Sequence, residues 1–277
     1  SGLSITTANS AGLISKGGAI QVTDLSVAAD TVAILNSANQ IAASGTIVVR
    51  GAQASTNINL GTGTGGLDLT AAEMAAFADG ATEMIIGASD TSGANKTTGT
   101  LTVSGENIVS ANPLDIYAGA TDFSTKLTAT GSSITGTFSG DVTSGDDSTA
   151  DLVGSTITID TSGSFGTASN NSVDVTATGA VSVSVGNASA DAAETIYMSS
   201  QGNLVLGALT TRKDSSLNAG DLVSLTSTGN ITDNNGSTAN ITAAVVSLDL
   251  TAGQGVGTSS DFIEVAGVKD ASSLTFQ

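Results

Sequence analysis

Short segments of alternating residues that recur at a nearly constant spacing are the feature that most constrains the fold of this chain. Segments such as "TIVVR", "TITID" and "AVSVSV" alternate apolar or β-branched residues with small polar ones, a pattern typical of half-buried strands. Small residues separate these segments, and the 277 residues include 34 Gly and a single Pro. The sequence therefore predicts an all-β fold built by repetition.

A ladder of glycines marks the repeat, because an apolar residue follows each of them within five positions. The steps between neighbouring glycines are 23 to 27 residues, apart from one step of 35. Short strands repeated about every 25 residues are what one turn of a parallel β-helix requires. The ladder consists of Gly18, Gly45, Gly80, Gly105, Gly131, Gly154, Gly179, Gly202, Gly229 and Gly253.

The one long step contains the only convincing helix signal in the sequence. Thr70 and Glu73 have the spacing of a capping box, and Asp79-Gly80 ends the helical pattern. Without the ten residues Thr70–Asp79 the step is 25 residues long. We therefore predict a helical insertion at about residues 70–79, with Met74 and Phe77 facing the coil because they lie three positions apart.

These patterns together predict that residues 1–277 form a single right-handed parallel β-helix of about eleven rungs with one short helical insertion. At about 4.8 Å per rung the rod is about 50 Å long. The end segments, "SGLSIT" and "SSLTFQ", resemble strands of rungs that are interrupted partway. We expect each end to continue into more β-helix or to stack end to end on another copy. The residues expected to point inward are Val181, Val183, Leu204, Leu206, Leu248 and Leu250.

The glycine-rich stretch "LDLTAGQGVGT" raises the possibility of a phosphate-binding loop, since it follows a predicted strand. It lacks both the G-x-G-x-x-G spacing and the lysine of a P-loop. An upstream stretch, "ITIDTSGSFGT", matches it at an offset of 91 residues, with Ile157 aligned to Leu248. We therefore interpret Gly253 as the corner of a repeat.

Composition excludes several classes of partner. The net charge is −18, with 7 Lys and Arg against 25 Asp and Glu, whereas nucleic-acid binding requires clustered basic side chains. Anionic membrane surfaces repel such a chain, and no apolar run is long enough to span a membrane. We expect neither nucleic acid nor membrane insertion.

Few side chains are candidates for site chemistry. The carboxylates in "SGDVTSGDDSTAD" resemble calcium ligands, but we favour acidic turns in water. Asn240-Ile241-Thr242 has the glycosylation spacing, and Arg212-Lys213 is interpreted as a solvated loop. We predict no catalytic, cofactor-binding or metal-binding residues and no cofactor. The acidic candidates are Asp141, Asp146, Asp147 and Asp151.

The sequence contains few of the side chains that commonly take part in catalysis. There is no His, no Cys and no Gly-x-Ser-x-Gly elbow. A carbohydrate-cleaving β-helix with paired carboxylates stays open as an alternative, although 6 Phe, 2 Tyr and no Trp leave few aromatic platforms. An S-layer-type surface protein, built as an antiparallel sandwich, is a further alternative. We expect no enzymatic activity.

The stretches "INLGTGTGGLDLTAAEM", "LVSLTSTGNITDNNG" and "LDLTAGQGVGTSSDFIEV" resemble the repeat region of large bacterial exoproteins of the filamentous-haemagglutinin type. The resemblance covers roughly Ile20 to Leu274. It implies a right-handed β-helix displayed on the bacterial surface or released from it. It also implies a non-catalytic adhesive or fibre-forming role, with surface glycans or receptors on host or neighbouring cells as partners.

Overall fold

A computed structural model gives the fold of the chain. It describes residues 2–6, 18–30, 37–63, 65–89, 96–145, 149–168, 171–187, 193–211, 221–243, 246–266 and 274–276. The chain divides into two compact units, Ser1–Thr137 and Phe138–Gln277. The two units are described in turn.

The fold is a parallel β-solenoid of about nine turns with one short helix, and strands account for 52% of the residues. The prediction of a parallel β-helix with one helical segment is therefore confirmed. The structure has fewer turns than the predicted eleven because some turns contain more residues than the repeat of about 25. The turn from Ile47 to its register partner Met84, for example, carries an additional strand and the helix.

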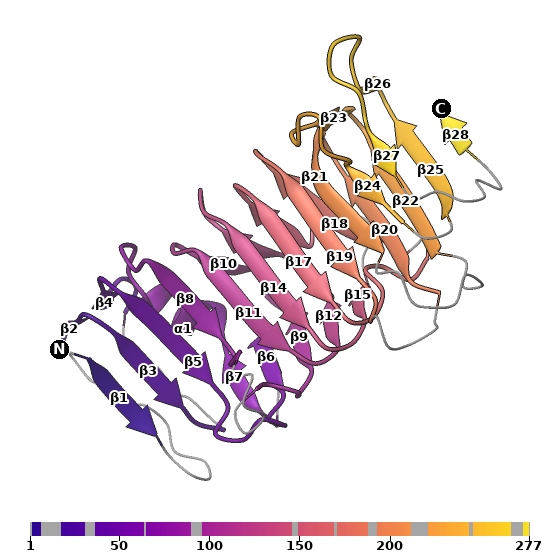
Figure 1. The fold of residues 1–277 in the computed structure, drawn as a ribbon. Coiled ribbons are helices and arrows are strands. Elements are labelled where there is room, and N and C mark those ends of the chain that lie inside the picture. The colour runs from indigo at the N-terminus through magenta and orange to yellow at the C-terminus, as the bar shows by residue number, and fades with distance from the viewer. Residues whose placement is uncertain are drawn as a thin grey trace. The chain divides into compact units, whose positions relative to one another are not determined.

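The first unit coils its strands into three main sheets (Figure 1). The first sheet stacks β1 (Leu3–Thr6), β3 (Leu25–Ala28), β5 (Thr46–Arg50), β8 (Glu83–Ile86) and β11 (Leu114–Ala118). The second contains β7 (Leu67–Leu69), β6 (Ile58–Gly61), β9 (Leu101–Ser104) and β12 (Thr121–Phe123). The third contains β10 (Ile108–Ser110) and β13 (Leu127–Ala129), and β2 (Ile20–Val22) pairs separately with β4 (Ile41–Ala43). The boundary between the units falls within β14 (Ile134–Phe138).

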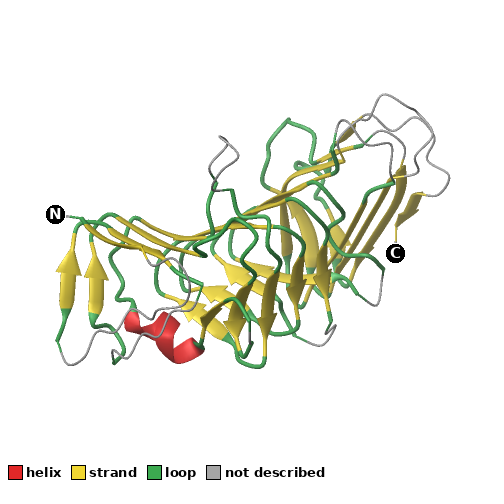
Figure 2. Ribbon diagram, turned by 90° about the horizontal axis from the view of Figure 1, so that it is seen from below, coloured by secondary structure: helices red, strands yellow, loops and turns green. Residues whose placement is uncertain are grey.

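The predicted helix is present as α1 (Ala71–Ala76), and its N-terminus has the predicted capping box. The Thr70 hydroxyl accepts from the Glu73 amide at 3.2 Å, and the Glu73 carboxylate accepts from the Thr70 amide at 2.8 Å. Met74 and Phe77 are each 2% exposed, so both face the interior as predicted. Phe77 also forms a parallel bridge with Ile41. The helix is thus part of the wall of the coil (Figure 2).

A buried asparagine that the sequence patterns did not identify secures the segment after this helix. Asn112 is fully buried in the turn before β11. Its Oδ1 accepts from the amides of Gly80 and Ala81 at 3.1 and 2.9 Å. Its Nδ2 donates to the carbonyl of Ala78 at 3.0 Å. These bonds satisfy backbone groups of the segment between α1 and β8.

The second unit coils mainly two sheets (Figure 1). The first stacks β17 (Ile157–Thr161), β19 (Val181–Val185), β21 (Leu204–Thr211), β23 (Asn230–Asp233) and β26 (Gly255–Val256). In this sheet β24 (Ile241–Thr242) lies between β21 and β27 (Val265–Ala266). The second sheet stacks β16 (Leu152–Gly154), β18 (Val173–Ala177), β20 (Thr195–Ser200), β22 (Asp221–Ser227), β25 (Val246–Ala252) and β28 (Leu274–Phe276). Phe165 forms bridges with Val142 of β15 (Val142–Ser144) and with Ile196.

The core of this unit consists of like residues stacked in register. Ile157 pairs with Val181, and Val181 pairs with Leu206. Of the six residues predicted to point inward, five are 1% exposed or less, and the side chain of Leu248 lies outside the described residues. Because β-strand side chains alternate between faces, most small polar residues of these strands lie on the outside, while Thr161, Ser200 and Ser227 are buried.

Most of the predicted glycine ladder marks one corner of the coil. Eight of its glycines lie one to three residues before β5, β8, β14, β17, β19, β21, β23 and β26. Gly18 and Gly105 instead precede β2 and β10, which belong to other sheets, so their place on the ladder was wrong. The spacing alone did not separate them because every corner of such a coil accepts glycine.

A contact between neighbouring turns explains why several corners require glycine. In unit 1, Oδ1 of Asp24 accepts from the Thr46 amide at 3.0 Å, and a Cβ on Gly45 would overlap that oxygen. In unit 2, Oδ1 of Asn203 accepts from the Asn230 amide at 2.9 Å, and Gly229 lies against it in the same way. We call this arrangement the corner clamp. It also occurs with Asp141, Gly163 and Ser164.

The stretch around Gly253 is a corner, as interpreted from the sequence. Gly253 joins β25 to β26, and its amide donates to the carbonyl of Ser227 at 2.8 Å. The alignment of Leu248 with Ile157 was wrong, because Leu248 lies in the second sheet of unit 2 and Ile157 in the first. Both segments alternate in the same way, so the sequence match did not distinguish the two sheets.

We predict that Val181→Asp lowers the free energy of unfolding by about 3–5 kcal/mol, since it places an unpaired carboxylate in the core. Thr158→Asp, on the exposed face of the neighbouring strand, serves as the control and should change stability by about 0.5 kcal/mol or less. Urea unfolding followed by circular dichroism measures both. Equal effects of the two substitutions would contradict the assignment of faces.

We predict opposite effects for alanine at two ladder glycines. Gly229→Ala should lower stability by about 1–3 kcal/mol because the new methyl group overlaps Asn203. A Cβ at Gly202 meets nothing within 4 Å, and Gly202→Ala should raise stability by about 0.4–1 kcal/mol by restricting the unfolded chain. The same unfolding assay compares them. A Gly229→Ala protein as stable as the wild type would argue against the corner clamp.

Candidate functional site

The acidic residues considered as calcium ligands do not form one site among the described residues. Asp146 and Asp147 lie outside them. Asp141 is exposed and belongs to a corner clamp. Asp151 is buried, where it accepts from the Asp174 amide at 2.8 Å and from the Ser144 hydroxyl at 3.1 Å. Within the described part of the chain, no group of three or more His, Cys, Asp or Glu is placed to hold a metal ion.

The candidate glycosylation acceptor has a structural role. Asn240 is fully buried. Its Nδ2 donates to Asp233 at 2.5 Å, and its Oδ1 accepts from the Glu264 amide at 3.0 Å. A glycan therefore has no access to this side chain in the folded protein. Arg212 and Lys213 lie outside the described residues.

A pair of carboxylates on the outer face of β8 and β11 was not identified from the sequence. Asp115 pairs in register with Ile85, two positions from Glu83. The hydroxyl of Tyr117 donates to Oδ2 of Asp115 at 2.9 Å, while Oδ1 of Asp115 is buried without a hydrogen-bond partner. Burial, and then the neighbouring charge of Asp115, raise the pKa of Glu83. Burial and the contact with Asp115 also raise the pKa of Tyr117.

A second pair of carboxylates lies beyond the neighbouring strands β23 and β26, with Asp233 at the end of β23 and Asp261 after β26. The hydrogen bond from Asn240 lowers the pKa of Asp233. Burial, and then the contact with Asp233, raise the pKa of Asp261. The two pairs occur in different units. Neither pair lines any of the three surface hollows described next.

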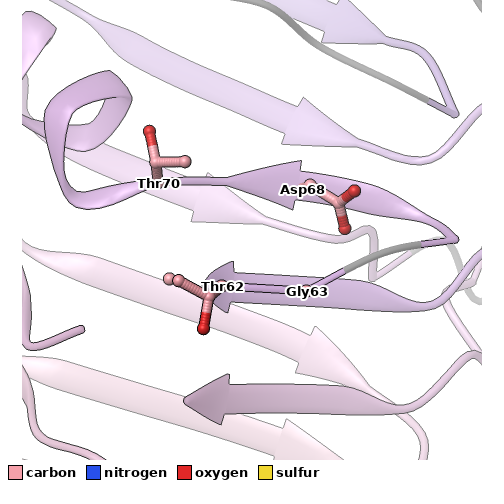
Figure 3. A pocket seen from close by; sticks show the side chains of 5 residues that line it. Thr62, Gly63, Asp68 and Thr70 are labelled. Atoms are coloured by element: carbon pink, nitrogen blue, oxygen red, sulfur yellow. The ribbon is translucent and has the colours of Figure 1, made fainter. Parts of the chain in front are cut away.

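Three of the hollows on the surface of the described chain are lined mainly by small or polar residues. Figure 3 shows the first, where Asp68 on β7 and Thr70 directly after this strand lie beside Thr62, which follows the neighbouring β6. This hollow has a volume of about 440 Å³, and Asn59 donates to Asp68 at 2.5 Å. The second, of about 370 Å³, is lined by Asp30, Ser55, Thr56, Asn57, Gly65 and Gly66.

The third hollow, of about 220 Å³, is the one that contains an aromatic side chain. It lies on the outer face of the second sheet of unit 2, around Tyr197. The lining of the first two hollows includes one carboxylate each, and that of the third includes none. These hollows offer hydroxyl, amide and backbone groups for hydrogen bonding. None of the three hollows contains two carboxyl groups that could act as a general acid and a general base.

Comparison with known proteins assigns no family. No family model, no curated protein and no solved structure matches this chain. Among the described residues, no helix is long and apolar enough to cross a membrane.

We predict that Glu83→Gln stabilises the protein at neutral pH. The raised pKa means that the folded state binds the proton of Glu83 more tightly than the unfolded state does. The stability that this proton binding contributes is present below pH 4.5, which is the ordinary pKa of glutamate. It is lost as the pH rises through the raised pKa of Glu83. The neutral amide removes this loss.

The advantage of Glu83→Gln should therefore be seen at neutral pH and disappear below 4.5. Urea unfolding at both pH values measures it. Asp79→Asn removes an exposed carboxylate and controls for the change in net charge. An advantage of Glu83→Gln that is independent of pH, or equal to that of the control, would contradict the predicted pKa shift.

Proposed function

We propose that this chain is a non-catalytic structural or adhesive β-solenoid of a secreted or cell-surface bacterial exoprotein. The observation that carries the proposal is the periodic polar surface of the stacked strands. Asn59, Thr102 and Asp122 lie in register on the outside of unit 1. Ser199, Thr226 and Thr251 do so in unit 2. Hydrogen-bonding groups repeated at the strand spacing of about 4.8 Å suit many weak contacts along an extended ligand.

The chemistry of the surface supports binding over catalysis. Glycoside hydrolysis commonly uses two carboxyl groups that flank the scissile bond. The described hollows bring together no such pair. The chain also contains no His and no Cys. The carbohydrate-active alternative therefore has no particular observation in its favour, and the parallel strand pairing disfavours the antiparallel sandwich of the S-layer alternative.

We also propose end-to-end association or continuation of the solenoid. Among the described strands, β1 is terminal in its sheet and pairs with β3 alone. Its inward residues Leu3 and Ile5 are partly exposed, whereas their partners Leu25 and Val27 are 1% exposed. Phe262 and Val265, near the other end of the described chain, are 63% and 42% exposed. Further β-structure would bury these side chains and pair the free strand edges.

We expect the purified protein to bind surface polysaccharides or glycan-coated cells without releasing reducing ends. Retention on beads and reducing-end release from the same samples measure the two properties. Heat-denatured protein, which lacks the folded surface, serves as the control. Time-dependent release of reducing ends by the folded protein would contradict the non-catalytic proposal. Equal retention of the folded and heat-denatured proteins would contradict the adhesive proposal.

A further inference from the structure

We propose that the hollow around Tyr197 binds a single ring of a neutral saccharide. The polar and aromatic residues that line this Tyr197 hollow are Ser172, Tyr197, Ser199, Gln201, Ser224 and Thr226, and Met198 also lines it. The inference rests on the proposed adhesive function for its biological use. The binding itself can be measured independently.

The strands of the second sheet place these side chains on one outer face. Tyr197 pairs in register with Ser224, and Ser199 pairs with Thr226. Since outward residues alternate with buried ones such as Met198 and Leu225, these four side chains form two adjacent columns on the surface. The hollow therefore lies mainly across β20 and β22, and Ser172, directly before β18, borders it from the preceding turn.

The backbone around Tyr197 is fixed by the segment behind it. The Tyr197 amide donates to the carbonyl of Phe165 at 2.7 Å, and Phe165 is fully buried. Gly166, at φ +73°, lies so close that a Cβ there would come within 2.8 Å of the Tyr197 Cβ. The backbone that carries the Tyr197 side chain therefore has little conformational freedom. A preorganised aromatic side chain loses less entropy when a ligand binds against it.

A buried carboxylate orients two of the hydroxyl groups in the hollow. Asp174 is 1% exposed. Ser172 donates to its Oδ1 at 3.3 Å, and the hydroxyl of Ser199 bonds the same oxygen. Because both hydroxyl groups donate their hydrogen bonds to the carboxylate, the lone pairs of their oxygens remain available as acceptors. Gln201, Ser224 and Thr226 supply additional donors and acceptors.

This combination fits a neutral sugar better than other ligand classes. An aromatic face packs against the C–H groups of a sugar ring, and the hydroxyls of the ring are both donors and acceptors. The lining contains no Lys or Arg for a phosphate or an acidic sugar, and the net charge of −18 opposes anions. A volume of about 220 Å³ lies below the roughly 300–1,000 Å³ of pockets for larger ligands.

The tyrosine content of the chain allows a direct test. There are 2 Tyr and no Trp, so in a Tyr117→Phe protein Tyr197 is the only tyrosine that emits. Neutral oligomers of glucose, galactose and N-acetylglucosamine, with their monosaccharides, are the probes, and an acidic polysaccharide is the contrast. We expect a saturable change in tyrosine emission with at least one neutral series and a Kd on the order of 1 mM. Absence of any saturable change would overturn the proposal.

Two variants locate the binding. Tyr197→Ala should weaken binding at least tenfold by saturation-transfer NMR. Thr226→Val, which keeps the shape of an exposed side chain, should weaken it severalfold without unfolding the protein. Thr158→Val, on another sheet, should leave it unchanged. Circular dichroism verifies the fold of each variant.

The outcomes separate this inference from the proposed function. If folded Tyr197→Ala and Thr226→Val proteins both bind saccharides as the wild type does, the Tyr197 hollow is refuted while adhesion stands. If reducing ends are released, the non-catalytic function fails instead. Binding of oligomers together with their monosaccharides supports a single-ring site. Binding of polymers alone would overturn the single-ring form of the proposal.

Discussion

In a parallel coil, the backbone groups of each turn find their partners in the turns above and below. The amide of Ile157 donates to the carbonyl of Ala180, and that of Gly253 donates to Ser227 one turn earlier. Buried backbone groups without partners are costly, so neighbouring turns have to keep their register at the strands and at the corners. The corner clamps meet this requirement, because an Asp or Asn of one turn bonds the next turn where glycine allows close approach.

The same constraint accounts for how much of the fold the sequence predicted. Alternation and glycine spacing indicated the solenoid, since both follow directly from stacking. The capping residues Thr70 and Glu73 identified the helix because its N-terminal chemistry is local. Asn112 escaped prediction, since its partners Ala78, Gly80 and Ala81 lie more than thirty positions earlier. Long-range polar contacts of this kind leave no periodic signal.

The candidate site was less predictable than the fold. Tyr197 and Ser199 of β20 and Thr226 of β22 read as ordinary outward residues in the sequence, and only the register of the two strands brings them together. The carboxylates Glu83 and Asp115 likewise meet through the pairing of β8 with β11. A repetitive sequence therefore predicts the scaffold well, while the particular chemistry of its surface depends on which turns become neighbours.

The central claim is the in-register parallel stacking of turns, and spin labels on introduced cysteines test it directly because the chain contains no Cys. Thr251 pairs with Thr226 in the adjacent turn, whereas Thr176 lies on β18, three strands away in the same sheet. At about 4.8 Å per turn, labels at 251 and 226 should show strong dipolar broadening, and labels at 251 and 176 much weaker broadening. Equal broadening in the two pairs, or none in the first, would contradict the account.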